Sequence, residues 1–502
     1  MVSYETNAHI DEIERLREGN LMDVVRKTAR LYANRVAVGT YVANHGVQAC
    51  ATYRELWDDV RRSVTVMQDA YATGSHIMLV GDNGYDWFVL LCGIIGSGCV
   101  AIPLDARASE REIAQAARAT DADAILSRDA RGSTSIPLES FDAMMGRVRH
   151  TLAGELPTAG PCEAMRCSLM VGTSGSTSEP KYCMLSQRNM IAAALSLFHS
   201  MPVAEGGRVL SMLPLSHCFG LNLGMLYQLM CGSTIVMDVP QATYFDVLSS
   251  WKPQYIMCVP SVITALNTYA RIADASMVED VFSNLIDVFC GGAPITKEAA
   301  EEFMAHGTEL LIGYGLTECS PTISMNAPGH ASTDTVGVPC DLVEVRLVDG
   351  ELQVRSPAVM LGYYKDPKAT DLAMDGEWLR TGDLAYLDEW GRIVITGRKK
   401  SVIVLPTGEN VGPEEIESLV LADERIEYCR VYALQGRLFA DVYATGMSDE
   451  AVLQRMGQVN DTLAPHQRIM NWVVLHERPA TTALGKVVRR NHPSGNEGDP
   501  AD

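Results

Sequence analysis

A short segment rich in hydroxyl side chains, residues 173–181, has the composition of a phosphate-binding loop. Backbone N–H groups and hydroxyls can wrap a phosphate there, Gly175 supplies freedom of φ, and Lys181 ends the segment. The Gly-Lys-Ser/Thr ending of a Walker loop is missing. Because a cluster of Ser, Thr and Gly is also an ordinary surface turn, this segment alone is weak evidence for nucleotide binding.

Two glycine-rich turns follow predicted strands further along the chain. The apolar run at 285–290 leads into Gly291-Gly-Ala-Pro294, and the run at 309–312 leads into Gly313-Tyr-Gly315. In parallel α/β sheets, ligands bind beyond the carboxyl ends of strands. These turns are therefore expected to lie at a ligand site.

The elements that position these motifs alternate in type. Helical patterns and short apolar runs alternate over the first 330 or so residues, which predicts parallel α/β sheets with buried strands. The predicted strands include 76–80, 208–213, 255–259, 285–290 and 309–312. The apolar stretch at 87–104 is broken by Gly96-Ser-Gly98, which favours a buried helix, a turn and a buried strand over a membrane span.

The C-terminal third of the chain has a different pattern. Short strands at 344–348, 351–355 and 392–395 predict a small β-rich module over about 336–397, which completes a large N-terminal domain, 1–397. Residues 398–490 predict a small, mobile α+β domain with helices at 413–422 and 449–463, strands at 402–405 and 472–475, and two further strands between the helices. The tail, 491–502, is predicted to be disordered.

Composition narrows the classes of function. A chain of 502 residues is too long for one core, so two or more domains are expected. The formal charge of −21 argues against nucleic acid and anionic membranes as partners. Thirteen scattered cysteines without a Cys-x-x-Cys pair favour a reducing cytoplasm over a disulfide framework or zinc site, and no signal peptide is visible.

The motifs also occur in an informative order. After the loop at 173–181 come the segments Leu213-Pro-Leu-Ser-His-Cys-Phe-Gly220, Gly291-Gly-Ala-Pro294, Gly313-Tyr-Gly-Leu-Thr-Glu318, Arg380-Thr-Gly-Asp383, Gly397-Arg-Lys-Lys400, Thr407-Gly-Glu-Asn-Val411 and Thr481-Thr-Ala-Leu-Gly-Lys486. From about residue 20 to 490, their order, identity and spacing resemble the adenylate-forming superfamily of acyl-CoA synthetases, adenylation domains and luciferases. Segments 313–321, 359–364 and 397–411 are most similar to bacterial long-chain fatty acyl-CoA synthetases.

The resemblance implies a ligase that works in two half-reactions. A carboxylate attacks the α-phosphate of ATP and gives acyl-AMP and pyrophosphate, and a thiol, usually coenzyme A, then displaces AMP. Both steps place negative charge on oxygens, so fixed donors, a lysine and Mg²⁺ are expected.

The resemblance also implies a role for each matched residue around the nucleotide. The phosphates would contact Thr173, Ser174, Gly175, Ser176, Thr177 and Lys181. The adenine would be flanked by Gly291, Gly292 and Ala293, with Tyr314 stacked on it and Gly315 in the same binding set. Asp383 would accept hydrogen bonds from the ribose hydroxyls, assisted by Arg398.

The catalytic residues implied are Thr317, Glu318 and Lys486. Thr317 would contact the α-phosphate, and Glu318 would hold Mg²⁺, a hard cation that prefers oxygen ligands. Lys486 would bridge the substrate carboxylate and the α-phosphate, a task that suits a point charge. Each of these residues also has an explanation without a catalytic role. Thr and Glu favour the first turns of helices, and a lysine is often simply exposed to solvent.

Further matched residues imply an acyl pocket and a hinge. The acyl pocket would comprise His217, Phe219, Gly220, Leu221 and Gly224, although a structural role explains His217 equally well. The C-terminal domain would rotate at Lys400, which removes Lys486 and brings Gly408 to the pantetheine channel.

Two positions depart from the family pattern. Ser178 and Tyr182 stand where related loops have glycine, and Glu179 adds negative charge beside the triphosphate. Since serine reaches positive φ only at a cost, we expect weaker ATP binding or a differently shaped loop.

Three functions remain open from the sequence. The first is an acyl-CoA ligase for an apolar, fatty acid. The second is a stand-alone adenylation enzyme that loads a carrier protein, and the third is a non-catalytic nucleotide-binding relative. Gly220 stands where amino-acid-activating relatives have an aspartate, and a buried ammonium without a partner is costly, which argues against amino acids. The acid, its length, the thiol acceptor and the oligomeric state stay undetermined.

Overall fold

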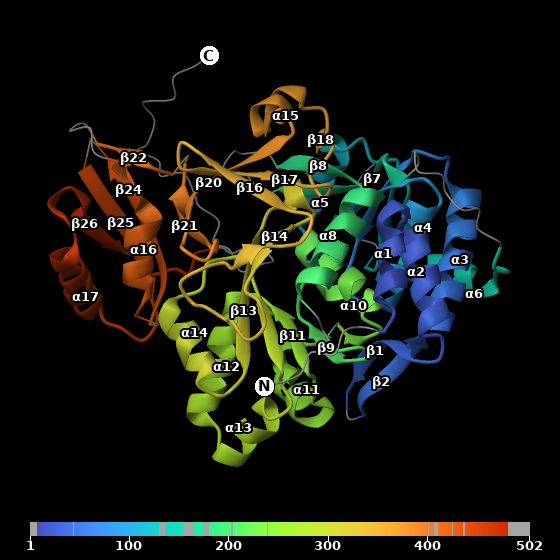
Figure 1. Ribbon diagram of the computed structural model, residues 1–502, viewed down its shortest axis with the longest axis horizontal. Coiled ribbons are helices and arrows are strands. Elements are labelled where there is room, and N and C mark those ends of the chain that lie inside the picture. The colour runs from blue at the N-terminus through green and yellow to red at the C-terminus, as the bar shows by residue number, and fades with distance from the viewer. Residues whose placement is uncertain are drawn as a thin grey trace.

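A computed structural model describes most of the chain. It covers residues 8–43, 45–129, 136–154, 164–173, 180–201, 204–237, 239–399, 401–405, 410–423, 425–434 and 437–479. In these residues the strands form two large sheets, a five-stranded sheet and two small C-terminal sheets (Figure 1). This arrangement confirms the predicted α/β class with a β-rich part.

The nine-stranded sheet carries the glycine-rich turns. Its order is β15-β14-β13-β12-β11-β9-β10-β1-β2, and the central strands from β13 to β1 run parallel. Its strands are β1 (Val36–Val42), β2 (Gly46–Thr52), β9 (Arg208–Ser211), β10 (Thr234–Val236), β11 (Tyr255–Cys258), β12 (Asp287–Cys290), β13 (Glu309–Gly315), β14 (Thr322–Met325) and β15 (Val338–Pro339).

The seven-stranded sheet carries the hydroxyl-rich loop. Its order is β18-β8-β7-β4-β3-β5-β6, with β8 and β18 antiparallel at one edge. Its strands are β3 (His76–Val80), β4 (Val100–Leu104), β5 (Ala124–Ser127), β6 (Leu138–Ser140), β7 (Cys167–Thr173), β8 (Lys181–Ser186) and β18 (Gly362–Tyr363).

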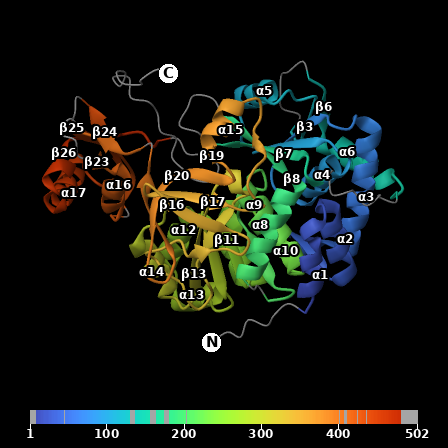
Figure 2. The ribbon, with the colours of Figure 1, turned by 45° about the horizontal axis from the view of Figure 1, so that its top comes forward.

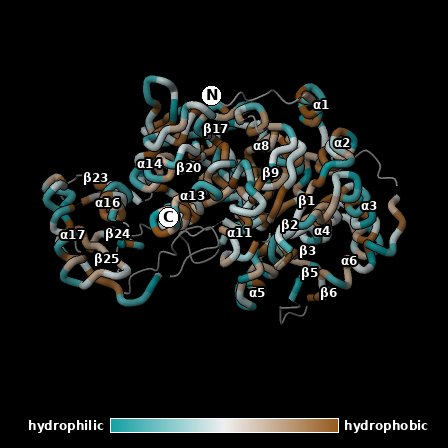
Figure 3. Tube along the Cα trace, turned by 90° about the horizontal axis from the view of Figure 1, so that it is seen from below, coloured by the Kyte–Doolittle hydropathy of each residue, from teal (hydrophilic) through white to brown (hydrophobic). Residues whose placement is uncertain are grey.

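Helices cover both large sheets (Figures 1 and 2). In the order of the chain they are α1 (Ile10–Glu14), α2 (Leu21–Leu31), α3 (Tyr53–Ala70), α4 (Tyr85–Gly96), α5 (Glu110–Ala119), α6 (Phe141–His150), α8 (Gln187–Ser200), α9 (Cys218–Leu221), a π-helical turn (Asn222–Leu226), α10 (Tyr227–Met230), α11 (Tyr244–Trp251), α12 (Pro260–Ile272), α13 (Ala275–Phe282), α14 (Lys297–Met304) and α15 (Pro367–Ala373). Outer helices such as α3 alternate between hydrophilic and hydrophobic residues (Figure 3), as expected for helices with one buried face.

The central strands bury both of their faces. Along β11, Tyr255 and Met257 belong to one apolar cluster, whereas Ile256 and Cys258 belong to another on the opposite face. The same alternation continues in β12 and β13. Because neither face meets water, these strands are continuous apolar runs, which is why the sequence predicts them well.

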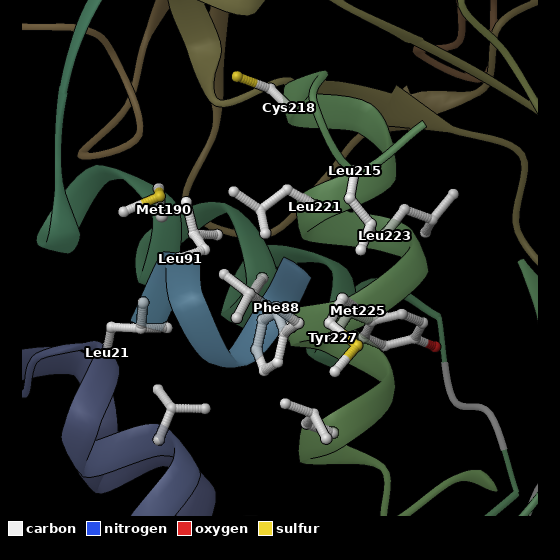
Figure 4. Packing of buried hydrophobic residues seen from close by; sticks show 14 of the residues in the cluster. Leu21, Phe88, Leu91, Met190, Leu215, Cys218, Leu221, Leu223, Met225 and Tyr227 are labelled. Carbon is white, nitrogen blue, oxygen red and sulfur yellow. The ribbon is translucent and has the colours of Figure 1, made fainter. Parts of the chain in front are cut away.

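Helix α4 is the apolar stretch that could be mistaken for a membrane span. Its residues 87–95 are buried, the chain turns at Gly98 with φ of +84°, and β4 follows, as predicted. Figure 4 shows Phe88 and Leu91 of α4 packed among Leu21 of α2, Met190 of α8 and Leu221 of α9. Over the described ranges, none of the helices combines the length and hydropathy that membrane crossing requires.

The C-terminal part contains the smaller sheets. The five-stranded sheet comprises β16 (Glu344–Val348), β17 (Glu351–Arg355), β19 (Met374–Asp375), β20 (Trp378–Leu387) and β21 (Ile393–Arg398). Beyond it lie β22 (Ile403–Val404), β23 (Asn410–Val411), α16 (Pro413–Leu421), β24 (Ile426–Leu434), β25 (Arg437–Ala444), α17 (Asp449–Thr462) and β26 (Ile469–Val474). These last elements have an apolar core of their own. That core supports the proposed division of the chain after residue 397, which stays a proposal.

The predicted strand limits differ from the structure in a few places. The strand predicted at 208–213 ends at Ser211, before Pro214, and the strand predicted at 472–475 begins earlier, at Ile469. The predicted strands do not include β2, β8 and β14, which pair antiparallel at or next to the edges of the two large sheets. A buried strand is recognised in the sequence by its apolar residues. Whether it pairs parallel or antiparallel depends on the adjacent strand.

The depth of α4 predicts a large loss of stability on truncation. Leu91→Ala removes a fully buried side chain and should lower the free energy of unfolding by about 2–5 kcal/mol, since it leaves a cavity. Leu152→Ala makes the same chemical change at a side chain that is 91% exposed and should have little effect. Urea unfolding followed by tryptophan fluorescence measures both, and equal losses would contradict the packing described here.

Candidate active site

The glycine-rich turns lie together at one edge of the nine-stranded sheet. Parallel pairing places Cys258 of β11 beside Cys290 of β12, and Cys290 beside Ile312 of β13. Gly291 and Gly292, which follow β12, therefore lie beside residues 313–315. The sequence predicts 313–315 as a turn, but these residues are the end of β13 because they pair with β14. A Cβ atom on Gly291 would lie 3.0 Å from the Gly313 carbonyl oxygen, so a larger residue would be crowded there.

Phe219 connects these turns to the predicted acyl segment. A Cβ on Gly291 would lie 3.2 Å from Cζ of Phe219, and one on Gly292, where φ is +82°, would lie 3.7 Å from Cδ1 of the same ring. The residues predicted for adenine and for the acyl chain are thus neighbours. Such proximity is what a reaction that joins an acid to a nucleotide needs.

Gly315 is required by the backbone around it. Its Cβ would lie 2.0 Å from the carbonyl oxygen of Pro321, because β14 returns antiparallel to β13 at this point. The chain then forms a short 3-10 turn, Thr317–Cys319, which presents Thr317 and Glu318 as half-buried side chains. A close backbone approach therefore explains this glycine without reference to a ligand.

Asp383 is a buried carboxylate with both oxygens engaged. The Tyr314 hydroxyl donates to Oδ2 at 2.5 Å, and Nε of Arg398 lies 2.9 Å from Oδ1. The Asp383 side chain is only 4% exposed, and its cost of burial is offset by these bonds. Burial, together with the charge of Asp383, raises the pKa of Tyr314 well above its usual value, so the phenol stays a donor.

Glu318 has a similar tyrosine partner. The Tyr363 hydroxyl donates to Oε1 of Glu318 at 2.7 Å. Three buried thiols, of Cys183, Cys218 and Cys319, also lie near this carboxylate. Burial, reinforced by the charge of Glu318, raises the pKa of each thiol, to about 12 for Cys218, so all three stay protonated.

This setting fits Mg²⁺ held jointly by protein and phosphate. Mg²⁺ is commonly bound by one or two carboxylates together with substrate phosphates. Within the described segments, no group of three or more His, Cys, Asp or Glu side chains forms an all-protein metal site. Glu318, as a single hydrogen-bonded carboxylate, could hold the ion only with the phosphates of ATP.

The two ends of the hydroxyl-rich loop meet at the hairpin between β7 and β8. Thr173 pairs with Lys181, and the Thr173 hydroxyl donates to the Lys181 carbonyl oxygen at 3.3 Å. The Lys181 Nζ lies 5.2 Å from the centre of the Tyr363 ring. The loop itself, which contains Ser174, Gly175, Ser176, Thr177 and Ser178, lies outside the described residues.

Tyr182 is a core residue of β8. It is 8% exposed, belongs to an apolar cluster with Met78 and Met170, and lies across the strand pair from Gly172. The sheet therefore accommodates this departure from the family pattern. The expectation of weaker ATP binding now depends on Ser178 and Glu179, and it stays a prediction.

The predicted acyl segment follows β9 as an irregular, buried helix. It passes from α9 through a π-helical turn, a form often found at functional sites, to α10. Leu221 is 2% exposed. A Cβ on Gly220 would lie 2.1 Å from the Pro214 carbonyl oxygen, and one on Gly224 would lie 2.3 Å from Oγ of Ser211. Local packing alone thus excludes an aspartate at position 220.

His217 begins this segment as a half-buried imidazole. Burial lowers its pKa, and the nearby carboxylate of Asp105 offsets this only in part, because Arg107 is paired with that carboxylate. The imidazole is therefore neutral near pH 7.

Comparison with known proteins identifies the group to which these residues belong. A family model described as AMP-binding enzyme matches residues 25–364. The chain belongs to this family. A feruloyl-CoA synthase from Amycolatopsis sp is 27% identical over 442 residues, which cover 83% of this chain and 86% of that protein. A long-chain-fatty-acid–CoA ligase of Escherichia coli O157:H7 is 33% identical over 265 residues, 50% of this chain and 47% of that protein.

Solved structures share the fold of this AMP-binding enzyme. An o-succinylbenzoate CoA synthetase from Bacillus subtilis, solved with its acyl-adenylate intermediate, has a TM-score of 0.82 at 20% identity and covers 95% of this chain and 99% of its own. A Mycobacterium tuberculosis fatty acyl CoA synthetase has a TM-score of 0.72 at 21% identity, covering 93% and 96%. The protein is therefore an adenylate-forming enzyme of the acid–CoA ligase type, while the acids named for its relatives differ.

The fold of this AMP-binding enzyme brings several of the predicted site residues close together. Other predicted site residues lie outside the part of the chain that the structure describes. Thr173 pairs with Lys181, and Tyr363 contacts both Lys181 and Glu318. Tyr314 bonds to Asp383, and Thr317 precedes Glu318 in the same short turn.

Lys400, Gly408 and Lys486 lie outside the described residues. Their roles at the hinge, at the pantetheine channel and in catalysis therefore stay predictions. The sequence-based predictions do not include Tyr363, although it lies in the segment 359–364 that resembles long-chain fatty acyl-CoA synthetases.

The lowered pKa of His217 predicts a specific pH dependence of stability. The unfolded chain, with a histidine pKa of about 6.5, binds a proton more readily than the folded protein. The stability that comes from a neutral His217 is present above that pH and is lost as pH falls toward the lower folded pKa. His217→Gln should therefore reduce the fall in thermal midpoint between about pH 7.5 and about pH 5.5.

A second histidine provides the control for this measurement. His330→Gln removes an exposed imidazole and should keep the wild-type pH dependence. If both variants behave alike, burial of His217 is not the cause of the acid sensitivity.

Proposed function

We propose that this AMP-binding enzyme activates an apolar, fatty acid as its acyl-adenylate and transfers the acyl group to coenzyme A. The observation that carries this proposal is the absence of charge from the acyl segment. Residues 213–230 contain no Asp, Glu, Lys or Arg, and the described side chains from Leu221 to Met230 are buried. An apolar tail gains about 0.8 kcal/mol for each buried CH₂, whereas a charged substituent would have no partner there.

The nucleotide half of the site supports the first half-reaction. We assign Lys181 and the loop before it to the phosphates, and Asp383 with Arg398 to the ribose. Each oxygen of the Asp383 carboxylate has two lone pairs, so it can still accept ribose hydroxyls while bonded to Tyr314 and Arg398. Glu318 would hold Mg²⁺, which would neutralise charge on the phosphate oxygens.

A specific observation favours a second candidate, a hydroxylated aryl acid. Among the described residues of the acyl region, three buried polar atoms have no hydrogen-bond partner: Oγ of Ser211, Oγ of Ser216 and Oδ1 of Asn222. Buried polar groups are usually satisfied, so a substrate hydroxyl in this region would find acceptors and donors. The relative with the wider coverage is named a feruloyl-CoA synthase, which agrees with this alternative.

A screen of acids distinguishes the two candidates. Saturated fatty acids of graded length and hydroxycinnamic acids would be supplied with ATP, Mg²⁺ and coenzyme A, and pyrophosphate and thioester would be measured by a coupled assay and mass spectrometry. We expect the fatty acids to give acyl-CoA, with a KM that falls as the chain lengthens. Turnover of the hydroxycinnamic acids alone would establish the second candidate instead.

The same screen tests the remaining alternatives. Pyrophosphate release without thioester, followed by loading of a phosphopantetheinylated carrier protein, would show that the acceptor is a carrier protein. Absence of pyrophosphate release with every acid would favour a non-catalytic nucleotide-binding relative.

The proposed role of Lys486 predicts separable half-reactions. Lys486→Ala should slow adenylation by about 10²–10³, since it removes a charge needed in one transition state, and should still convert supplied acyl-AMP and coenzyme A to product. Lys400→Pro should show the reverse defect, because proline fixes φ at the proposed hinge. Lys368→Ala, at an exposed lysine of α15, is the matched control and should change neither step.

Pyrophosphate exchange and thioester formation would be measured separately for these variants. If Lys486→Ala and Lys400→Pro lose both half-reactions to the same extent, rotation of the C-terminal domain is not how this enzyme works.

A further inference from the structure

Tyr363 contacts both halves of the candidate site. Its hydroxyl donates to Oε1 of Glu318 at 2.7 Å, and Glu318 follows β13 of the nine-stranded sheet. The face of its ring lies 5.2 Å from Nζ of Lys181, which begins β8 of the seven-stranded sheet. One side chain thus touches the residue proposed for Mg²⁺ and the residue proposed for the phosphates.

The backbone around Tyr363 is anchored on several sides. Tyr363 lies opposite Cys183 in the antiparallel pair of β18 and β8. Leu361 N–H donates to the Met184 carbonyl oxygen at 2.9 Å, and Tyr363 N–H donates to the Thr370 hydroxyl at 2.9 Å. These bonds hold the tyrosine in place independently of Glu318 and Lys181.

The chemistry of the tyrosine makes it a fixed donor. An ionised carboxylate can only accept a hydrogen bond, so the Tyr363 hydroxyl is the donor in the 2.7 Å contact with Oε1 of Glu318. This bond occupies one lone pair of Oε1 and leaves the remaining lone pairs of Glu318 for a cation or water.

The ring provides a separate contact for the lysine. An ammonium over the face of an aromatic ring is attracted by the ring quadrupole, an effect that does not need the hydroxyl. Lys181 is a long, flexible side chain, so a ring beneath it limits the positions that Nζ can take. The hydroxyl and the ring of Tyr363 can therefore be tested independently.

We propose that Tyr363 is a positioning residue for ATP, holding Glu318 through its hydroxyl and Lys181 through its ring. This inference rests on the proposed function, because it assigns those two residues to the metal and the phosphates. Partners that orient metal-binding carboxylates in this way typically contribute a factor of 10–100 to metal affinity or activity.

Binding of ATP to the full-length protein tests the proposal without turnover. The dissociation constant of ATP would be measured by calorimetry in Mg²⁺ and in EDTA, with no acid present. Tyr363→Phe keeps the ring and loses the hydroxyl, so it should weaken binding by about 10-fold in Mg²⁺ and leave binding in EDTA unchanged. Tyr363→Leu removes the ring as well and should weaken binding in both conditions.

The neighbouring tyrosine is a matched control. The Tyr364 hydroxyl bonds to Asp121 at 2.8 Å, at the surface and away from Glu318. Tyr364→Phe therefore removes the same atom one residue along the chain and should leave ATP binding at the wild-type value in Mg²⁺ and in EDTA.

A double variant shows whether the hydroxyl acts through Glu318. In a Glu318→Gln background, Tyr363→Phe should cause no further loss of Mg²⁺-dependent affinity, because the carboxylate it positions is already absent. Equal losses in both backgrounds would overturn the proposal. A lower thermal midpoint for Tyr363→Phe, with Mg²⁺-dependent ATP affinity unchanged, would also overturn it, since the tyrosine would then act only on stability.

This experiment separates the inference from the proposed function. If the wild-type protein binds ATP more tightly in Mg²⁺ but releases no pyrophosphate with any acid, the proposed ligase activity fails and the Tyr363 comparison still holds. If turnover is normal and Tyr363→Phe binds ATP like the wild type in both conditions, the positioning role alone fails.

Discussion

The burial of both faces of the parallel strands is the constraint on which this structure depends. Alternate residues of β11, β12 and β13 enter two different apolar clusters, so neither face of these strands can present polar groups to a ligand. Polar chemistry is left to the turns at the carboxyl edge, where the backbone leaves the sheet. Gly291 directly follows the end of β12, and Glu318 lies just beyond the end of β13, for this reason.

The candidate site holds its carboxylates with protonated tyrosines. Tyr314 donates to Asp383 and Tyr363 donates to Glu318, and burial keeps both phenols protonated. A carboxylate removed from water needs such donors. The Glu318 side chain bonds to the neutral Tyr363, whereas Asp383 is also paired with the charged Arg398.

In the acyl segment, core packing and substrate specificity can both explain the same residues. Gly220 is required because its Cα lies against the Pro214 carbonyl, and Gly224 because it lies against Ser211. The absence of an aspartate at position 220 agrees with an apolar substrate, yet the close approach of the Pro214 carbonyl by itself excludes a side chain there. The unpartnered oxygens of Ser211, Ser216 and Asn222 are the features that packing does not explain.

The sequence by itself determined the elements and the family. Strands at 76–80, 344–348 and 351–355 and the buried helix before the turn at Gly98 were predictable, because the period of apolar residues reports which faces are buried. The motif order indicated the adenylate-forming superfamily, and the match of the AMP-binding enzyme model to residues 25–364 confirms the family. The sequence does not give the antiparallel direction of β2, β8 and β14, because pairing direction depends on the neighbouring strand.

Only the tertiary structure decided which of the candidate residues touch. Tyr363 and Glu318 are 45 residues apart, and Tyr314 and Asp383 are 69 apart, so no local pattern relates them. Tyr182 looked like an altered loop residue in the sequence and is a core residue of β8 in the fold. The spacing of apolar residues indicates which face of each segment is buried. Contacts between distant segments arise only when separate sheets and helices pack against one another.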